Sequence, residues 1–460
     1  MKTIISIGIL LFSTIILRGQ VFPVETIKNN GSKDKRINLV FVGDGYQSTE
    51  LTQYLIDVNT VVAGMFSQTP FKEYEKFFNV YAIKVPSVES GAKHPGTATD
   101  VTEPITPVTN PNNYFGSQFD ISNIHRLLLP LNGSAINTTL VNNFPDYDQI
   151  FVMVNSTVYG GSGGTYATSS KHAAAAEVAI HEIGHSFAGL ADEYLIGGQG
   201  ERPNRTTVTD GATIKWRNWL GTNNVGIYPV GIESWQRPHQ NCKMQFLNSP
   251  FCSVCTEAFI NKIYSLVSPI DNFTPLSKTV NFTGVSMNFS LGLILPNPNT
   301  LKIEWVLNGV TVGRDINNVN ILASKLDTGK NTLIAKVTDS TALSRIYKPA
   351  TSGYLNTITW TINKGGVPSP VETINQSDKV HYDIYPNPVE DVVNIHLSSQ
   401  NMMDIELSLF DMQGRRLAFI KRSRVDELLE NINMSRYAAG NYALRIKIGE
   451  YVFEKNIIKQ

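Results

Sequence analysis

The stretch "HEIGHSFAGLADEY", residues 181–194, sets two histidines four residues apart, with a glutamate directly after the first. Residues four apart on an α-helix lie one turn apart on the same face. The imidazoles of His181 and His185 can therefore reach one metal ion at about 2.0–2.1 Å. Glu182 is rotated by roughly a hundred degrees from His181, where its carboxylate can contact a metal-bound water without ligating the metal. The spacing predicts a metal-binding helix; an ordinary helix that happens to carry paired histidines is the alternative.

The flanking residues predict where this helix begins and ends. The segment "HAAAAEVAIHEIGHSFA" favours helix, and Ser169 or Ser170 is the predicted start. Gly189 follows His185 by four residues and is the predicted terminator. A helix that stops there lets the chain turn back toward the metal.

The acidic pair after the glycine offers a third metal ligand. A catalytic zinc site normally has three protein ligands and an open position for water. Asp192 is the predicted ligand because its short side chain suits a tight turn. Glu193 is the alternative, either as the ligand or as a partner that orients a histidine. His172 is predicted to be an exposed residue at the helix start, and His239 is a more distant ligand candidate.

These residue types predict metal-assisted hydrolysis of an amide bond. Zinc lowers the pKa of a bound water and polarises a substrate carbonyl. Glu182 would accept the proton of that water and pass it to the leaving amine, so that no covalent intermediate is needed. The predicted site therefore has Glu182 as the catalytic residue and His181, His185 and Asp192 as ligands of Zn²⁺.

The residues before the motif predict an α/β layer. Residues 37–42 ("INLVFV"), 78–85 ("FNVYAIKV") and 150–154 ("IFVMV") are apolar runs typical of buried strands. A helix is predicted from Ser48 or Thr49 through about residue 63, and alternation of strands and helices indicates an α/β layer. The glycine-rich residues 160–164 lack the Lys-Ser/Thr of a P-loop and are predicted to form a turn beside a cleft.

The second half of the chain predicts β-structure. Residues 269–364 contain short alternating runs and are predicted to form an immunoglobulin-like β-sandwich, with a hairpin turn at Asn308-Gly309. Residues 365–379 are polar and contain Gly and Pro, as in a linker. Residues 380–460 alternate again and predict a small C-terminal β-sandwich. Together these features predict a multidomain chain.

The N-terminus predicts export. Lys2 precedes an apolar run over residues 4–17, the length of a signal-peptide core, so residues 1–20 are the predicted signal peptide. No later segment approaches eighteen apolar residues, and no transmembrane span is expected in the mature protein. Lys+Arg and Asp+Glu are equal at 39 each, so no excess charge indicates a nucleic-acid partner.

Three cysteines lie close together in the sequence: Cys242, Cys252 and Cys255. In an exported chain, Cys242 can form a disulfide with Cys252 or Cys255, which leaves one thiol over. A zinc site built on Cys252-Ser-Val-Cys255 is the competing interpretation. It lacks an evident second pair of ligands in the sequence.

The motif and several other segments together resemble the bacterial IgA peptidase family of zinc metallopeptidases. The resemblance covers roughly residues 35–265 and implies a metzincin-like α/β zinc peptidase domain, predicted here over residues 21–268. The other segments are "INLVFVGDGY" (37–46), "FNVYAIKVPSVESG" (78–91), "VYGGSGGTYA" (158–167), "IKWRNWL" (214–220) and "RPHQNCKMQFLNSPFCSVCTEAF" (237–259).

The resemblance also implies a methionine turn beneath the metal. Cys242-Lys243-Met244 is similar to that turn, and Met244 is the candidate for its hydrophobic floor. The sequence departs from the usual metzincin pattern, because Asp192 follows His185 by one residue more than usual and is acidic rather than histidine. Where some relatives have an oxyanion-stabilising tyrosine, this chain has Phe246. Tyr194 and Tyr228 are the substitute candidates.

The C-terminal residues resemble a second family. Residues 382–460 are similar to the type A sorting domain of the type IX secretion system. This resemblance implies the secretion machinery as a partner and a product that is secreted or held on the cell surface. It rests on "YDIYPNPVEDVVNIHL", "LSLFDMQGRRL" and "INMSRYAAGNYALRIKIGEYVFEKNIIKQ".

The sequence thus predicts a secreted zinc metalloendopeptidase acting on extracellular protein or peptide substrates. Immunoglobulin or a mucosal glycoprotein is the candidate substrate that the family name suggests. One alternative is a catalytically inactive surface binding or adhesion protein that uses residues 269–364. Another is hydrolysis of a non-peptide amide or a glycan-linked substrate at the same metal site.

Overall fold

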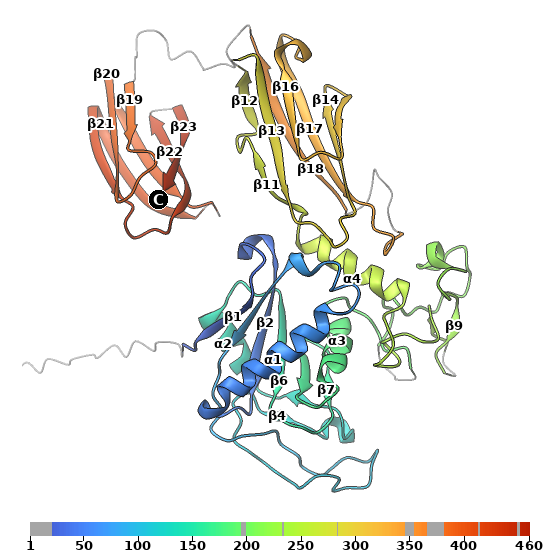
Figure 1. The fold of residues 1–460 in the computed structure, drawn as a ribbon. Helices are drawn as coiled ribbons and strands as arrows, with labels where there is room; N and C mark the ends of the chain where they lie inside the picture. Colours follow the sequence, from blue (N-terminus) through green and yellow to red (C-terminus); the bar gives the residue numbers. More distant parts are fainter. Residues whose placement is uncertain are drawn as a thin grey trace, which may run out of the picture. The chain divides into compact units, whose positions relative to one another are not determined.

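The computed structural model describes residues 21–194, 199–231, 234–282, 284–345, 354–365, 381–412, 415–448 and 451–460. The predicted signal peptide 1–20 and all but the first residue of the predicted linker 365–379 lie outside the described residues. The chain divides into two compact units, Met1–Lys364 and Gly365–Gln460. The structure is rich in β-strands, with four α-helices along the described residues (Figure 1).

The first unit contains a six-stranded sheet in the order β1-β3-β2-β6-β8-β7. Strands β2 (Ile37–Asp44), β3 (Phe78–Ile83) and β6 (Gln149–Val154) are buried along their whole length, as expected of strands covered on both faces. Strand β2 is parallel to both β3 and β6, and the three predicted strands are confirmed. The remaining strands are β1 (Val24–Lys28), β7 (Gly161–Ser162) and β8 (Ala167–Ser170).

Hydrophobic cores cover both faces of this sheet. Helices α1 (Leu51–Phe66) and α3 (Ala175–Ser186) contact each other and share one core with Phe41 of β2. Helix α2 (Gly133–Asn143) contributes to the other core, which contains Val40 of β2. Alternate residues of β2 therefore point to opposite faces, and this pattern fixes the two layers of helices.

The helix boundaries differ in part from those predicted. Ser48 and Thr49 lie in a 3-10 turn, and α1 begins just after it. The predicted start of the metal-binding helix at Ser169 or Ser170 is wrong, because both residues end strand β8 and pair with β6. Strand pairing satisfies their backbone groups, which outweighs their preference for capping positions. Gly189 has φ of +66° just beyond the end of α3, as predicted.

The short elements connect the larger ones. They are η1 (Lys33–Lys35), η2 (Ser48–Glu50), η3 (Glu75–Phe77), η4 (Ile121–Asn123), η5 (Arg217–Trp219), η6 (Ala323–Lys325), the pair β4 (Ser117–Gln118) and β5 (Leu129–Pro130), and the pair β9 (Tyr228–Pro229) and β10 (Gln236–Arg237). The glycine-rich residues predicted as a turn supply Gly161 and Ser162 to edge strand β7.

Helix α4 (Ser253–Leu266) leads into a β-sandwich with a single core. Asn308 and Gly309 both have positive φ, 49° and 83°, and form the predicted hairpin turn. One sheet contains β11 (Ile270–Thr274), β13 (Ser286–Leu293) and β16 (Asn318–Leu322). The other contains β12 (Thr279–Phe282), β18 (Leu355–Lys364), β17 (Gly329–Asp339), β14 (Leu301–Leu307) and β15 (Val310–Arg314).

The sandwich packs directly against the rest of the first unit. The buried carboxylate of Asp339, at the end of β17, accepts hydrogen bonds from the hydroxyls of Tyr74 and Tyr264. Arg36 forms an ion pair with Asp271 of β11 at 2.7 Å. These contacts join the sandwich to the sheet region as one compact unit.

The second unit is one curled sheet in the described residues 381–412, 415–448 and 451–460. Its order is β19 (His381–Tyr385), β20 (Val392–Phe410), β22 (Gly440–Ile448) and β23 (Tyr451–Lys459), with β21 (Arg416–Asn433) paired to β20. The predicted small β-sandwich is therefore wrong in its details. Register shifts along the long β20–β21 pair interrupt the ladder, and such irregularities let one sheet bend around its own core.

No helix among the described residues has the length and apolar character needed to cross a membrane.

Candidate metal centre

Helix α3 presents His181, Glu182 and His185 to a cleft with a volume of about 790 Å³. The loop after α3 lines this cleft, as do the β7 segment and residues beyond the turn at Met244. The sheet holds the helix, because α3 contacts both β7 and β8. The motif residues therefore lie on a rigid element and face open space.

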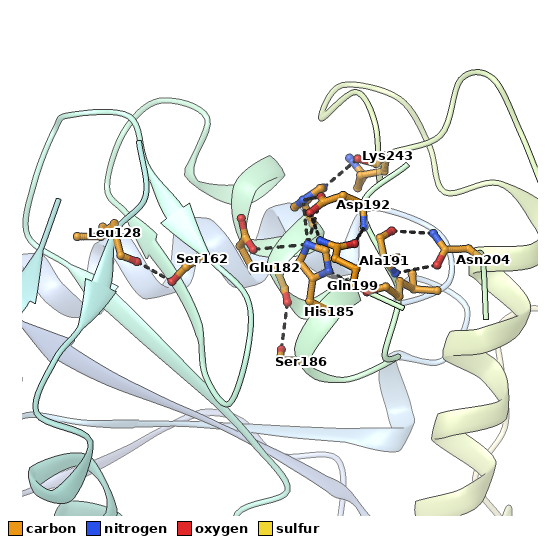
Figure 2. Close-up of polar contacts among 12 residues, drawn as sticks. Leu128, Ser162, Glu182, His185, Ser186, Ala191, Asp192, Gln199, Asn204 and Lys243 are labelled. Carbon is orange, nitrogen blue, oxygen red and sulfur yellow. Dashed lines mark hydrogen bonds and ion pairs between the residues drawn. The ribbon is translucent and has the colours of Figure 1, made fainter. Parts of the chain in front are cut away.

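Three possible ligand atoms converge in this cleft, and two of them belong to His185 and Asp192 (Figure 2). The Nε2 atoms of His181 and His185 are 3.2 Å apart. Oδ1 of Asp192 lies 3.1 Å from the first and 3.4 Å from the second. Tetrahedral ligands at 2.0–2.1 Å from an ion are separated by roughly 3.3 Å, so one divalent cation fits between the three atoms.

The hydrogen bonds of the imidazoles favour the same conclusion. Nδ1 of His181 donates to the carbonyl oxygen of Lys243 at 3.0 Å, and Nδ1 of His185 donates to that of Leu190 at 2.8 Å. Each Nε2 of the neutral rings then presents a lone pair. Two lone pairs and a carboxylate oxygen at such short distances repel one another unless a proton or a metal cation lies between them.

Asp192 completes the set of three atoms. Within the described residues, the buried Oδ1 of Asp192 has no hydrogen-bond donor apart from the two nearby imidazoles. Burial lowers the pKa of His185, but interaction with Asp192 outweighs this effect and raises that pKa to about 9. In the absence of metal the carboxylate would thus attract protons to the imidazoles. A bound cation takes the place of those protons.

Glu182 lies beside the three atoms without joining them. Its Oε2 is 4.0 Å from Nε2 of His185. Burial raises the pKa of the Glu182 carboxyl, which makes it a stronger base than an exposed glutamate. A Cβ on Gly163 would lie 2.9 Å from Oε2 of Glu182 and 2.7 Å from His185, so only glycine fits against this pair.

Two amide side chains hold the loop that carries Asp192. Gln199 donates to Oδ2 of Asp192 at 2.6 Å and accepts from its backbone N–H at 2.7 Å. Asn204 accepts from the N–H of Ala191 at 2.7 Å and donates to its carbonyl at 2.8 Å. Sequence reasoning missed both residues, because an amide in a loop has no periodic spacing that marks it.

Glu193, the alternative ligand, points away from the imidazoles. Its Oε1 accepts a hydrogen bond from Asn204 at 3.0 Å and from the thiol of Cys255 at 3.3 Å. Its backbone N–H donates to the carbonyl of Met244 at 2.9 Å. The geometry therefore brings Asp192, and not Glu193, to the two histidines.

Met244 lies beneath α3. It is fully buried, and a Cβ on Gly184 would meet its sulfur at 2.8 Å. The backbone N–H groups of Gln245 and Phe246 donate to the carbonyl of Cys242, which closes the turn. Met244 thus occupies the position expected for a hydrophobic floor.

The other candidates divide between the cleft and its surroundings. Tyr194 lines the cleft, whereas Tyr228 is not among its described lining residues and donates instead to the carbonyl of Asn224 at 3.3 Å. The ring nitrogens of His172 and His239 accept hydrogen bonds from nearby backbone N–H groups. These two histidines are not brought to the metal centre.

Two further polar residues of the cleft were not predicted from the sequence. Arg126 and Tyr159 line the cleft, and both interact electrostatically with Glu182. The hydroxyl of Tyr194 interacts with Asp192 and Arg126, and burial together with Asp192 raises the pKa of Tyr194 to about 12. Tyr194 is therefore a hydrogen-bond donor at neutral pH. Arg126 comes from the long connection between β3 and β6, where the sequence carries no recognisable motif.

Comparison with solved structures gives low overall similarity. Latent PorU from Porphyromonas gingivalis matches with 11% identity, 41% of this chain, 20% of that chain and a TM-score of 0.15. A Parabacteroides merdae β-glucuronidase matches with 9% identity, 49% and 28% coverage, and a TM-score of 0.18. Fibronectin(III)-like modules of Clostridium thermocellum CbhA match with 11% identity, 42% and 93% coverage, and a TM-score of 0.17. The chain thus spans less than a third of the length of the first two.

Comparison with families is more informative. No curated protein matches the chain. Residues 25–229 match the model of the family described as IgA Peptidase M64, and residues 383–460 match that of the secretion system C-terminal sorting domain. The first match contains the helix, the loop and the three converging atoms described above. Residues 25–229 are therefore similar to the M64 peptidases, and residues 383–460 are similar to the C-terminal sorting domains of a secretion system.

Proposed function

We propose that this chain is a secreted zinc metalloendopeptidase. His181, His185 and Asp192 hold the ion, and Glu182 is the general base. The observation that carries the proposal is the convergence of three ligand atoms within 3.4 Å while both Nδ1 atoms are committed to backbone carbonyls. The M64 match supports the same reaction class.

When bound, zinc lowers the pKa of water and polarises the substrate carbonyl. Glu182 accepts a proton from the attacking water at its carboxylate and then delivers that proton to the leaving amine. Its burial supports this role, because the raised pKa increases its affinity for the proton. Gly163 leaves the space in which the carboxylate can lie beside His185.

Tyr194 and Arg126 are the proposed donors to the oxygen of the scissile carbonyl. Both line the cleft, and the Tyr194 hydroxyl is protonated at neutral pH, as for an ordinary tyrosine, with a pKa raised further to about 12. Donors aimed at a developing negative charge stabilise the transition state more than the ground state. Phe246 occupies the position after the methionine turn where some relatives have an oxyanion-stabilising tyrosine. Tyr194 thus supplies the hydroxyl that this turn lacks.

The substrates are proposed to be extracellular proteins, with immunoglobulin and mucosal glycoproteins as the first to test. The domain limits at residues 20, 268, 364 and 379 are part of the same proposal. A metzincin-like fold for the peptidase domain is also part of this proposal, and the methionine turn beneath α3 supports it. The sorting domain and the predicted signal peptide support secretion or display on the cell surface.

The test uses the mature full-length protein with casein as the substrate. Glu182→Gln is expected to retain zinc and to lose activity by about 10²–10⁴-fold, because it removes the proton acceptor and not a ligand. Glu25→Gln, at an exposed position of β1, is the matched control and should behave as the wild type. Equal activity of Glu182→Gln and wild type, or wild type that binds no zinc after reconstitution, would contradict the proposal.

A further inference from the structure

A second group of possible ligands lies next to the metal centre. Glu193, Cys242, Cys252 and Cys255 are all buried, and each offers one ligand atom within 4.8 Å of all the others. The sequence showed only the Cys252–Cys255 pair as a plausible unit. Folding adds Cys242 from the methionine turn and Glu193 from the loop after α3.

The spacing of the sulfur atoms suits a shared ion. Sγ of Cys242 and Sγ of Cys255 are 3.6 Å apart, and all three cysteines are free thiols. A disulfide requires about 2.05 Å between sulfurs. Thiolates at about 2.3 Å from a tetrahedral zinc ion are separated by roughly 3.8 Å, which is close to the observed distance.

The glutamate supplies an independent observation. Within the described residues, Oε2 of Glu193 is buried without a hydrogen-bond partner, although the residue is only 1% exposed. A buried carboxylate oxygen without a donor is costly unless a cation neutralises it. One ligand atom of Glu193 and the three cysteine sulfurs all lie within 4.8 Å of one another, so the cluster offers four acidic ligands to a cation.

Helix α4 adds to the preference for anionic sulfur. Cys252 is the N-cap of α4, and Cys255 lies in its first turn. The positive end of a helix dipole stabilises thiolates. The Cys-x-x-Cys spacing also brings two sulfurs to one ion, as in structural zinc sites.

We propose that Glu193, Cys242, Cys252 and Cys255 bind a second, structural zinc ion. Four protein ligands leave no open position, so this ion takes no part in hydrolysis. It would join three segments that build the metal centre: the loop with Asp192, the turn with Lys243 and Met244, and the start of α4. The carbonyl of Lys243 accepts the Nδ1 proton of His181, so the second ion would brace the first site.

The first experiment counts zinc in the mature full-length protein purified under reducing conditions with zinc present. Wild type is expected to hold two ions per chain, and the His181→Ala/His185→Ala variant one. X-ray absorption of that variant should show sulfur at about 2.3 Å from zinc. One zinc in wild type that disappears in the double variant would overturn the proposal. One zinc that persists there, with sulfur ligation, would keep this proposal and contradict the catalytic one.

The second experiment distinguishes the ion from a disulfide. Denatured protein in chelator, without reductant, should show three reactive thiols per chain; a single thiol would overturn the proposal. Glu193→Gln keeps every sulfur and nearly the same volume, so it should fold and yet lose the second zinc to a competing chelator before wild type does. Ser253→Ala, between Cys252 and Cys255, is the matched control and should retain both ions. If Glu193→Gln and wild type retain both ions equally, the assignment of Glu193 as a ligand of the second ion is wrong.

Discussion

Gly163 lies against Glu182 and His185, two side chains of the proposed active site. Its missing Cβ would sit 2.7 Å from His185 and 2.9 Å from Oε2 of Glu182. Gly163→Ala should therefore displace Glu182 and lower kcat/KM by about 10–100-fold, because small misplacements of catalytic groups are costly. Zinc content should stay unchanged. Gly164→Ala is the control, since no described atom lies within 4 Å of its Cβ; equal loss in both variants would refute the steric argument.

Replacement of Gln199 tests how strongly its side chain holds the loop that carries Asp192. Its amide makes two hydrogen bonds to Asp192. Gln199→Ala should weaken zinc affinity by about 10–100-fold, the usual effect of losing a partner that orients a ligand. Chelator competition measures this change, and Gln53→Ala on an exposed position of α1 serves as control. Unchanged zinc affinity would show that the backbone alone orients Asp192.

At the residue scale, the sequence predicted those site residues that helical spacing or side-chain chemistry can identify. Helical spacing identified His181 and His185, and the acidic pair after Gly189 narrowed the third candidate to two residues. Geometry alone separated Asp192 from Glu193, because adjacent side chains of a loop point in different directions. Arg126 could not be found in this way, since it lies in a turn between η4 and β5, where no periodic spacing marks it.

At the element scale, Lys243 joins the methionine turn to the metal-binding helix. Its buried ammonium group pairs with Glu177 in the first turn of α3 and donates to the carbonyl of Leu247. Lys243→Met should lower the free energy of unfolding by about 1–3 kcal/mol, because it breaks a partly buried ion pair and removes the donor to the Leu247 carbonyl, while Glu177 keeps its hydrogen bond from Gln68. Thermal unfolding measures the change, with Lys72→Met as an exposed control. A loss no larger than that of the control would show that the turn is held by its other contacts.

The elements that were predicted correctly are those with strong local patterns. The apolar strands β2, β3 and β6 were found because burial on both faces leaves a continuous run. The start of α3 was misplaced because Ser169 and Ser170 favour capping locally but pair with β6 in the sheet. The curled C-terminal sheet was also missed. Alternation predicts strands, but not whether two strands belong to one sheet or to two.

At the scale of the whole molecule, Asp339 links the sandwich to the sheet region. Its carboxylate accepts hydrogen bonds from the hydroxyls of Tyr74, Tyr264 and Thr300. Asp339→Ala should lower the free energy of unfolding by about 2–4 kcal/mol, because two buried hydroxyls and one partly buried hydroxyl lose their shared acceptor.

Calorimetry of Asp339→Ala and of Tyr264→Phe provides the measurement. Tyr264→Phe should cost about 1 kcal/mol, since it removes a single hydrogen bond. Tyr385→Phe in the second unit, at an exposed position, should leave the first unit's Tm unchanged. If Asp339→Ala is no less stable than Tyr385→Phe, the sandwich is held by its other contacts, which include the Arg36–Asp271 ion pair.

The Asp339 carboxylate binds hydroxyls from both parts of the first unit, and this has a consequence for how such chains evolve. Gene shuffling usually exchanges modules joined by exposed linkers, because each carries its own complete interior. In this chain, a division near residue 268 would leave Tyr74 and Tyr264 in one piece and their hydrogen-bond acceptor, Asp339, in the other. Lineages of this chain should therefore inherit the two pieces together, and new specificities should arise by changes in the loops around the cleft.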